Sequence, residues 1–121
     1  MKYIPAEKRN WVEGQGYTKN ILLKGVEDLH CEGALVQLLT IQPNATVPPH
    51  YHKKGLEVFY IIKGRGSMTI NDEVIHLHEG DTLTCEPGEV HSAENPYDEP
   101  FEYIIFKTNW EAEDSIWLKE D

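Results

Sequence analysis

Residues 48–66, which read PPHYHKKGLEVFYIIKGRG, decide the fold class. Their second half contains residues 56–62, an apolar run rich in β-branched and aromatic side chains between two glycines, which is typical of a β-strand. The first half places His50 and His52 one residue apart, so in an extended chain both imidazoles lie on the same face. Glu57 begins the apolar run and faces the same interior if the Lys-Lys-Gly turn resets the register. Polar groups in such a segment are costly without partners, so the stretch predicts a β-fold with a polar site in its interior.

Short apolar runs closed by turn residues recur along the chain, and this rhythm is typical of an all-β fold. A succession of about eight short antiparallel strands leaves bare edges unless it closes, which favours a β-barrel or a two-sheet jelly roll. An immunoglobulin-like sandwich is the alternative, but it leaves the histidines and the glutamate unexplained. Residues 42–49, QPNATVPP, are rich in turn-forming residues and are interpreted as a connection. The expected strands are residues 18–25, 33–43, 56–64, 66–71, 73–80, 81–88, 90–95 and 100–109.

The domain organisation is expected to be simple, because 121 residues support one hydrophobic core and are short for two. We expect a single domain over residues 1–121, with the barrel over about residues 18–108. The tail, residues 109–121, combines acidic residues with Trp110 and Trp117. We expect this tail to be irregular or to form a short helix, packed on the barrel or on a partner subunit.

The charge and the apolar runs exclude several classes of partner. The chain has 21 acidic and 11 basic residues, a formal net charge of −10, which repels phosphate backbones and anionic lipid surfaces. No apolar run approaches the roughly 20 residues that span a bilayer, and the first residues do not resemble a secretion signal. Cys31 and Cys85 lie far apart and outside any Cys-x-x-Cys spacing. We therefore expect a cytoplasmic protein that binds neither nucleic acid nor membranes.

A third histidine extends the polar cluster. His91 follows a Pro-Gly turn, at the point where the chain re-enters the expected barrel. Each of these residues alone is more often a surface or core residue than a ligand. Together, His50, His52, His91 and Glu57 offer three imidazoles and a carboxylate without a thiolate, a set that suits Fe, Mn, Co, Ni or Zn. An octahedral metal on these four residues keeps two positions for water or substrate. The sequence therefore predicts a site for one divalent transition metal per chain.

Two motifs in the chain resemble those of a known family. The pattern His50-x-His52-x4-Glu57-x6-Gly64 resembles the first conserved motif of the cupin superfamily. The stretch GDTLTCEPGEVHSAEN, residues 80–95, resembles the second motif, with His91 in the ligand position. The resemblance implies a small single-domain cupin, a double-stranded β-helix or jelly-roll barrel in which His50, His52, Glu57 and His91 hold a divalent metal. It also implies a homodimer, formed by strand exchange or sheet packing.

The match to these motifs has two departures. Asn44 stands where the first motif usually begins with Gly, and Glu86 stands where the second usually has Pro. Both positions lie at turns or strand ends, so we expect neither to affect metal binding.

Strand alternation gives candidates for the wall of a pocket beside the metal. Gln37 shares one face of its expected strand with leucines and an isoleucine, and Tyr103 shares a face with Phe101. If these faces point inward, Gln37 and Tyr103 are the polar groups nearest the metal, in a pocket that Phe59 and Ile61 make largely apolar. The competing interpretation is core packing, in which both side chains fill space.

The sequence favours a metal-dependent enzyme that acts on a small molecule. It contains neither a Gly-x-Ser-x-Gly nucleophile motif nor a phosphate-binding loop, so the metal has to carry the chemistry. No second acid or base beyond Tyr103 is evident, and this favours dioxygenase-like chemistry over an isomerase, a lyase or a decarboxylase. A non-catalytic module that binds or senses a metal and a small ligand is the alternative from a different class.

Overall fold

The computed structural model describes residues 1–118, which form short antiparallel strands with two single turns of helix. The helical turns are η1 (Ala6–Lys8) and η2 (Gly25–Leu29). The strands are β1 (Val12–Glu13), β2 (Thr18–Leu23), β3 (Leu35–Ile41), β4 (Thr46–His52), β5 (Leu56–Lys63), β6 (Gly66–Ile70), β7 (Glu73–Leu77), β8 (Thr82–Cys85), β9 (His91–Glu94), β10 (Phe101–Thr108) and β11 (Ser115–Trp117).

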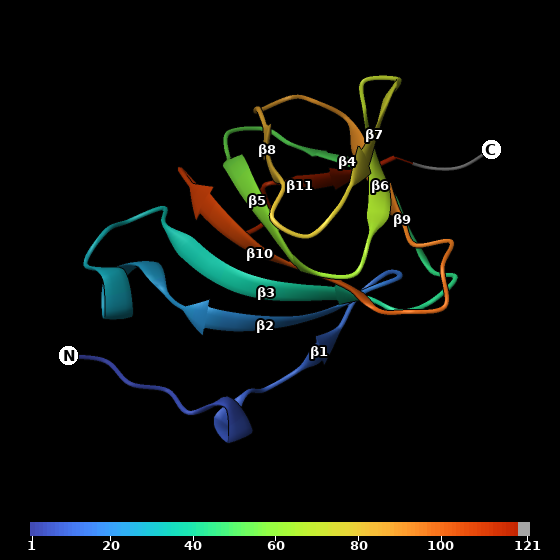
Figure 1. Ribbon diagram of the computed structural model, residues 1–121. Coiled ribbons are helices and arrows are strands. Elements are labelled where there is room, and N and C mark those ends of the chain that lie inside the picture. The colour runs from blue at the N-terminus through green and yellow to red at the C-terminus, as the bar shows by residue number, and fades with distance from the viewer. Residues whose placement is uncertain (119–121) are drawn as a thin grey trace.

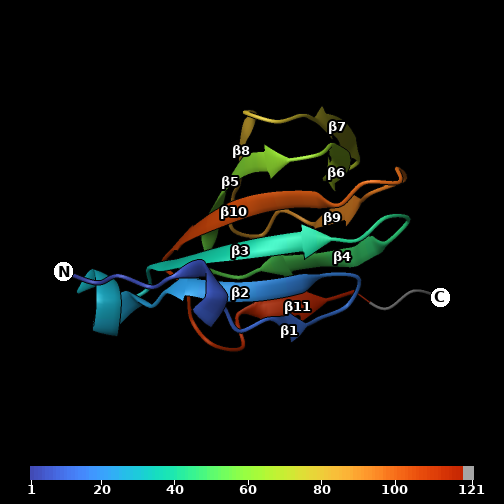
Figure 2. The same ribbon diagram turned by 60° about the horizontal axis from the view of Figure 1, so that its bottom comes forward.

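The strands build two sheets that face each other (Figures 1 and 2). One sheet has six strands in the order β1-β2-β3-β10-β5-β8, and the other has five in the order β11-β4-β9-β6-β7. Because chain neighbours such as β3 and β4 or β8 and β9 lie in different sheets, the chain winds back and forth between them. This is a double-stranded β-helix, or jelly roll, and it confirms the predicted all-β fold.

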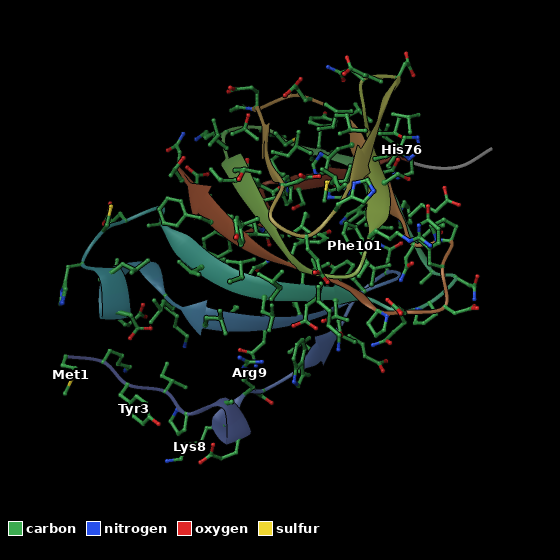
Figure 3. The ribbon with its side chains drawn as sticks, in the orientation of Figure 1. Met1, Tyr3, Lys8, Arg9, His76 and Phe101 are labelled. Carbon is green, nitrogen blue, oxygen red and sulfur yellow. The ribbon has the colours of Figure 1, made fainter. Side chains whose placement is uncertain are left out.

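The core lies between the two sheets and follows the alternation expected from the sequence. On β10, Phe101, Tyr103 and Ile105 are all buried, and Phe101 lies in the interior in Figure 3. On β5, Phe59 and Ile61 are buried on the same inward face. Each such apolar side chain stabilises the fold by roughly 1.5–3 kcal/mol when it is removed from water. The interior is thus largely apolar, and the predicted ligands are among the few polar side chains buried in it.

Strand β4 differs from the sequence-based expectation, because residues 46–49 were interpreted as part of a connection and instead begin this strand. Pro48 and Pro49 are turn formers that lack an N–H, and within sheets proline is confined to edges and bulges. The pairing of β4 with β9 shifts register between Val47 and His50, so both prolines lie at an irregularity of the ladder. The pairing resumes with His50 opposite His91 on β9.

The C-terminal tail also differs from the expectation of an irregular or helical segment. Ser115, Ile116 and Trp117 form β11, which pairs antiparallel with the otherwise free edge of β4. Isoleucine and tryptophan favour strands, and an unpaired edge offers backbone groups that need partners. Residues 110–118 contain no helix, and the last part of the tail, residues 119–121, lies outside the described residues.

The two departures from the motifs are accommodated by the backbone. Asn44 adopts a φ of 63°, in the left-handed region that glycine prefers and that asparagine tolerates better than most residues. The backbone N–H of Glu86 donates a hydrogen bond to Glu89 Oε1 at 2.7 Å, a bond that proline cannot make. Both substitutions are therefore compatible with the turns in which they lie.

The N-terminal residues lie along the outside of the fold. Met1, Tyr3 and Lys8 follow an extended arm on the far side of β2 from the five-stranded sheet (Figure 3). Within residues 1–118, none of the helical segments has the length and apolarity to cross a membrane.

Asn95 closes the second motif, and we expect its replacement by alanine to destabilise the metal-free protein by about 2–4 kcal/mol. Its side chain is fully buried; Nδ2 donates to the carbonyls of Ile41 and Glu99, and Oδ1 accepts from the N–H of Tyr97. The substitution leaves these backbone groups without partners. Urea unfolding measures the loss, with Asn10→Ala on the exposed N-terminal arm as the control. A loss as small as the control's would contradict this role.

Candidate metal centre

The four predicted ligands come together between the two sheets. His50 and His52 lie on β4 and His91 begins β9, whereas Glu57 enters from β5 of the opposite sheet. One ligand nitrogen from each of the three histidines lies within 4.8 Å of the others. Glu57 Oε1 lies 2.7 Å from His52 Nε2 and 3.2 Å from His91 Nε2. The structure therefore gathers every residue that the motifs singled out.

The outer ring nitrogens of the histidines are engaged by other groups. His50 Nδ1–H donates to the carbonyl of Pro48 at 2.9 Å, and His91 Nδ1–H donates to the carbonyl of Glu89 at 3.2 Å. His52 Nδ1 lies 3.0 Å from the hydroxyl of Ser115. Such contacts fix the tautomer and the orientation of a ligating imidazole, and they leave Nε2 to face the interior.

Two atoms at the centre of the cluster lack hydrogen-bond partners. His52 Nε2 and Glu57 Oε1 are buried and lie 2.7 Å apart, but they are not aligned to form a hydrogen bond with each other or with another group of the described residues. A buried polar atom without a partner costs roughly 1–3 kcal/mol. A divalent cation between these atoms removes that cost, because it is a partner for the imidazoles and for the carboxylate at once. Three nitrogens and one oxygen therefore fit a divalent transition metal.

The charge state of two of the ligands suits a metal. Burial, together with the neighbouring His91, lowers the pKa of His50 to about 4, so this imidazole is neutral at pH 7. Burial raises the pKa of Glu57, but the close imidazoles of His52 and His91 and the charge of Lys107 lower it further, so the net shift is downward and the group is a carboxylate. Neutral imidazole and carboxylate are the forms in which these side chains bind metals.

His91 differs from His50 in its charge state. Burial lowers its pKa, but contacts with the Cys85 thiol and the Glu57 carboxylate raise it more, to about 10. In the metal-free protein His91 therefore carries a proton that offsets the charge of Glu57, and a metal has to displace that proton.

A cavity of about 220 Å³ opens beside the four ligands. Gln37 and Tyr103, the predicted pocket residues, both line it and are both buried, and Phe59 lies on the same wall. Burial raises the pKa of Tyr103 far above its ordinary value, and the negative charge of Glu57 adds to the shift. Its phenol therefore keeps its proton and acts as a hydrogen-bond donor rather than as a base.

Three further residues beside the site were missed from the sequence. Lys107 lines the cavity with Nζ 3.8 Å from Glu57 Oε2. It lies on the same inward face of β10 as Phe101, Tyr103 and Ile105. Extending that alternation by one step finds it. Ser115 and Trp117 come from β11, and the Trp117 ring stacks on the His50 ring with centroids 4.2 Å apart and planes 27° apart. No local sequence signal places these two residues.

The chain is similar to known proteins in sequence and in structure. A family model described as a cupin domain matches residues 37–107. An oxalate-binding protein of Thermotoga maritima is 27% identical over 100 residues, which cover 83% of this chain and 83% of that protein. A T. maritima structure described as a predicted oxalate decarboxylase matches with a TM-score of 0.75 at 22% identity, over 88% of this chain and 98% of that one. A double-stranded β-helix protein of Klebsiella pneumoniae matches with a TM-score of 0.77 at 20% identity, over 99% of both chains. At these identities the structural matches show the fold alone.

We expect Glu57→Gln to weaken metal binding by at least about 100-fold, because loss of a direct ligand exceeds the 10–100-fold typical of outer-shell partners. Glutamine keeps the shape of the side chain and removes the charge that faces His52 and His91. Competition with a chromophoric chelator measures the affinity for Zn²⁺ and Co²⁺. Glu73→Gln, on the exposed part of β7, is the matched control and should bind like the wild type. Equal affinities for the two variants would remove Glu57 from the ligand set.

Proposed function

The chain belongs to the cupin domain family, and from this premise we propose that it binds a small carboxylate anion at a divalent metal held by His50, His52, Glu57 and His91. The observation that carries the proposal is the convergence of three imidazole nitrogens and one buried carboxylate at the wall of a cavity of about 220 Å³. When bound there, a divalent cation supplies positive charge that an anionic oxygen can coordinate.

The cavity wall favours an anion. Lys19 and Lys107 both line it, and so do Glu57, Glu111 and Glu113. The Lys107 side chain is only 12% exposed, so an anion that pairs with it is shielded from water and ions. Gln37 and Tyr103 offer neutral hydrogen-bond donors beside it. Together with a divalent cation on the four ligands, Lys107 and these donors favour a carboxylate over a neutral molecule.

The size of the cavity limits the anion. A volume of about 220 Å³ corresponds to roughly seven waters at the volume each has in the liquid. It suits an anion with a few carbon atoms, such as a short mono- or dicarboxylate. The similarity to an oxalate-binding protein supports the same size and charge class.

The predicted dioxygenase activity stays a prediction, and one of its premises has changed. The sequence favoured a dioxygenase over a decarboxylase because the expected pocket was largely apolar, with Tyr103 as the single candidate for acid–base chemistry. Lys107, Lys19 and Tyr17 also line the cavity, so groups that carry protons are present beside the ligands. Decarboxylation of a bound dicarboxylate is the second candidate. In that reaction the carbon–carbon bond to one carboxylate breaks, carbon dioxide leaves, and the remaining carbon takes a proton from Lys107.

The proposal also covers the cellular location and the oligomeric state of the protein. We keep the expectation that the protein acts in the cytoplasm, and that it forms a homodimer. The exposed apolar residues Tyr60, Ile62 and Phe106 share the outer face of the six-stranded sheet, and an apolar face of this kind supports subunit packing.

We expect oxalate to bind the metal-loaded protein, and Lys107→Met to weaken that binding by about 10–100-fold, which corresponds to the loss of one charge-assisted contact. Isothermal titration of oxalate into protein loaded with Zn²⁺ measures the affinity, and release of carbon dioxide tests turnover. Lys53→Met, an exposed lysine after β4, is the matched control.

The neutral diamide of oxalate is the control for charge, and the metal content of each variant is measured alongside. Equal affinity for the diamide and for oxalate, or undiminished oxalate binding by the metal-free protein, would refute the proposed carboxylate site. Oxalate binding without carbon dioxide release would favour a binding module over a decarboxylase.

A further inference from the structure

The last described strand, β11, contributes two of its three side chains to the metal centre. Ser115 pairs with His52 across the β4–β11 ladder, and Trp117 pairs with His50, so each lies beside a predicted ligand, with Ser115 exposed and Trp117 half-buried. Ile116, between them, pairs with Tyr51 and faces the other side. The register of this short edge strand thus sets one side chain against each histidine of β4.

We propose that Ser115 and Trp117 are positioning residues of the metal centre, which fix the orientation of the His52 and His50 rings and so set the metal affinity of the chain. This inference rests on the proposed metal function of the four ligands. It assigns to the C-terminal segment a part in the site that the two motifs do not contain.

Ser115 provides the outer contact of His52. The outer nitrogens of His50 and His91 are paired with carbonyls two residues away in their own strands or turns. His52 instead relies on the hydroxyl of Ser115, which is 63 positions away in the chain. Without this hydroxyl, the Nδ1 atom of a ring that is only 7% exposed loses its protein partner. The ring torsion of histidine is broad, so the angle of this ligand is then unspecified.

Trp117 contacts the most exposed of the three histidine ligands. His50 is half-buried, whereas His52 and His91 are buried. The indole of Trp117 stacks on the His50 ring at a centroid distance of 4.2 Å and also packs against the hydrophobic core. It therefore limits rotation of His50 and shields its open side from water.

The segment before β11 is tied to the turn that separates the ligands of β4 and β5. Asp114 is buried, and its carboxylate accepts hydrogen bonds from the backbone N–H groups of Lys54 and Gly55, the latter at 2.9 Å. The carbonyl of Asp114 accepts a further bond from the N–H of Lys53. This turn joins His52 to Glu57, so the same segment that orients two rings also holds the connection between two ligands.

The hydroxyl of Ser115 is tested by Ser115→Ala, with Ser67→Ala on β6 as the matched control. We expect the alanine variant to lose about 10–100-fold in affinity for Zn²⁺ and Co²⁺, the usual effect of an outer-shell partner. We also expect its Co²⁺ absorption bands to shift, while its metal-free unfolding midpoint stays near that of the control. Ser115→Thr keeps a hydroxyl in a strand and should restore the affinity and the spectrum.

The indole of Trp117 is tested by Trp117→Leu and Trp117→Phe, with Trp11→Leu on the N-terminal arm as the control. Leucine removes the stacked ring, so we expect weaker metal binding and altered Co²⁺ bands. Phenylalanine keeps an aromatic face against His50 and should retain more of the affinity than leucine. If Ser115→Ala fails to fold, this pair of variants decides the inference.

Three outcomes count against the inference. If the wild type binds one metal and Ser115→Ala and Trp117→Leu bind it equally well with unchanged Co²⁺ bands, β11 does not position the ligands, although the proposed metal function stands. If affinity falls only in proportion to the unfolding midpoint and threonine gives no rescue, the role of the strand is structural. If the wild type takes up no metal, the inference fails together with the proposed function.

Discussion

The burial of the Glu57 carboxylate opposite three imidazoles is the constraint on which the rest of the structure depends. A charged oxygen inside a barrel is unfavourable unless it has partners, and one oxygen of this carboxylate has none of acceptable geometry within residues 1–118. The imidazole nitrogen 2.7 Å away is in the same condition. A cation shared by all four side chains is a partner for both atoms at once. The polar centre therefore fits a metal-binding site.

The architecture around this centre supplies ligands from both sheets. Two histidines come from β4 and one from β9, which pair with each other, and the glutamate comes from β5 across the interior. The prolines of β4 interrupt its ladder just before His50, and the ladder resumes with His50 opposite His91. The edge strand β11 then covers the free side of β4 and adds contacts to both of its histidines. The site is thus an outcome of strand pairing rather than of a single loop.

Much of the fold and of the site could be predicted, because alternation and turn residues are local signals. The inward faces that contain Gln37, Phe59 and Tyr103 follow from a period of two, and the motif spacings single out the four ligands. The start of β4 was missed because its prolines signal a turn locally, while the pairing with β9 is a tertiary effect. The tail was missed for a similar reason: the free edge of β4 selects strand β11, and no feature of residues 109–118 reveals that edge. Lys107 could have been predicted from the alternation of β10, because it lies two residues after Ile105 and therefore on the same face of the strand.

Elemental analysis of untagged protein tests the central claim most directly. The wild type and a His50→Ala, His52→Ala double variant are purified together, and the iron, manganese, cobalt, nickel and zinc content per chain is measured for both. The account predicts close to one equivalent of one of these metals in the wild type, either as purified or after reconstitution, and almost none in the double variant. A wild type that neither holds nor takes up any of them, or a double variant that holds as much, would contradict it.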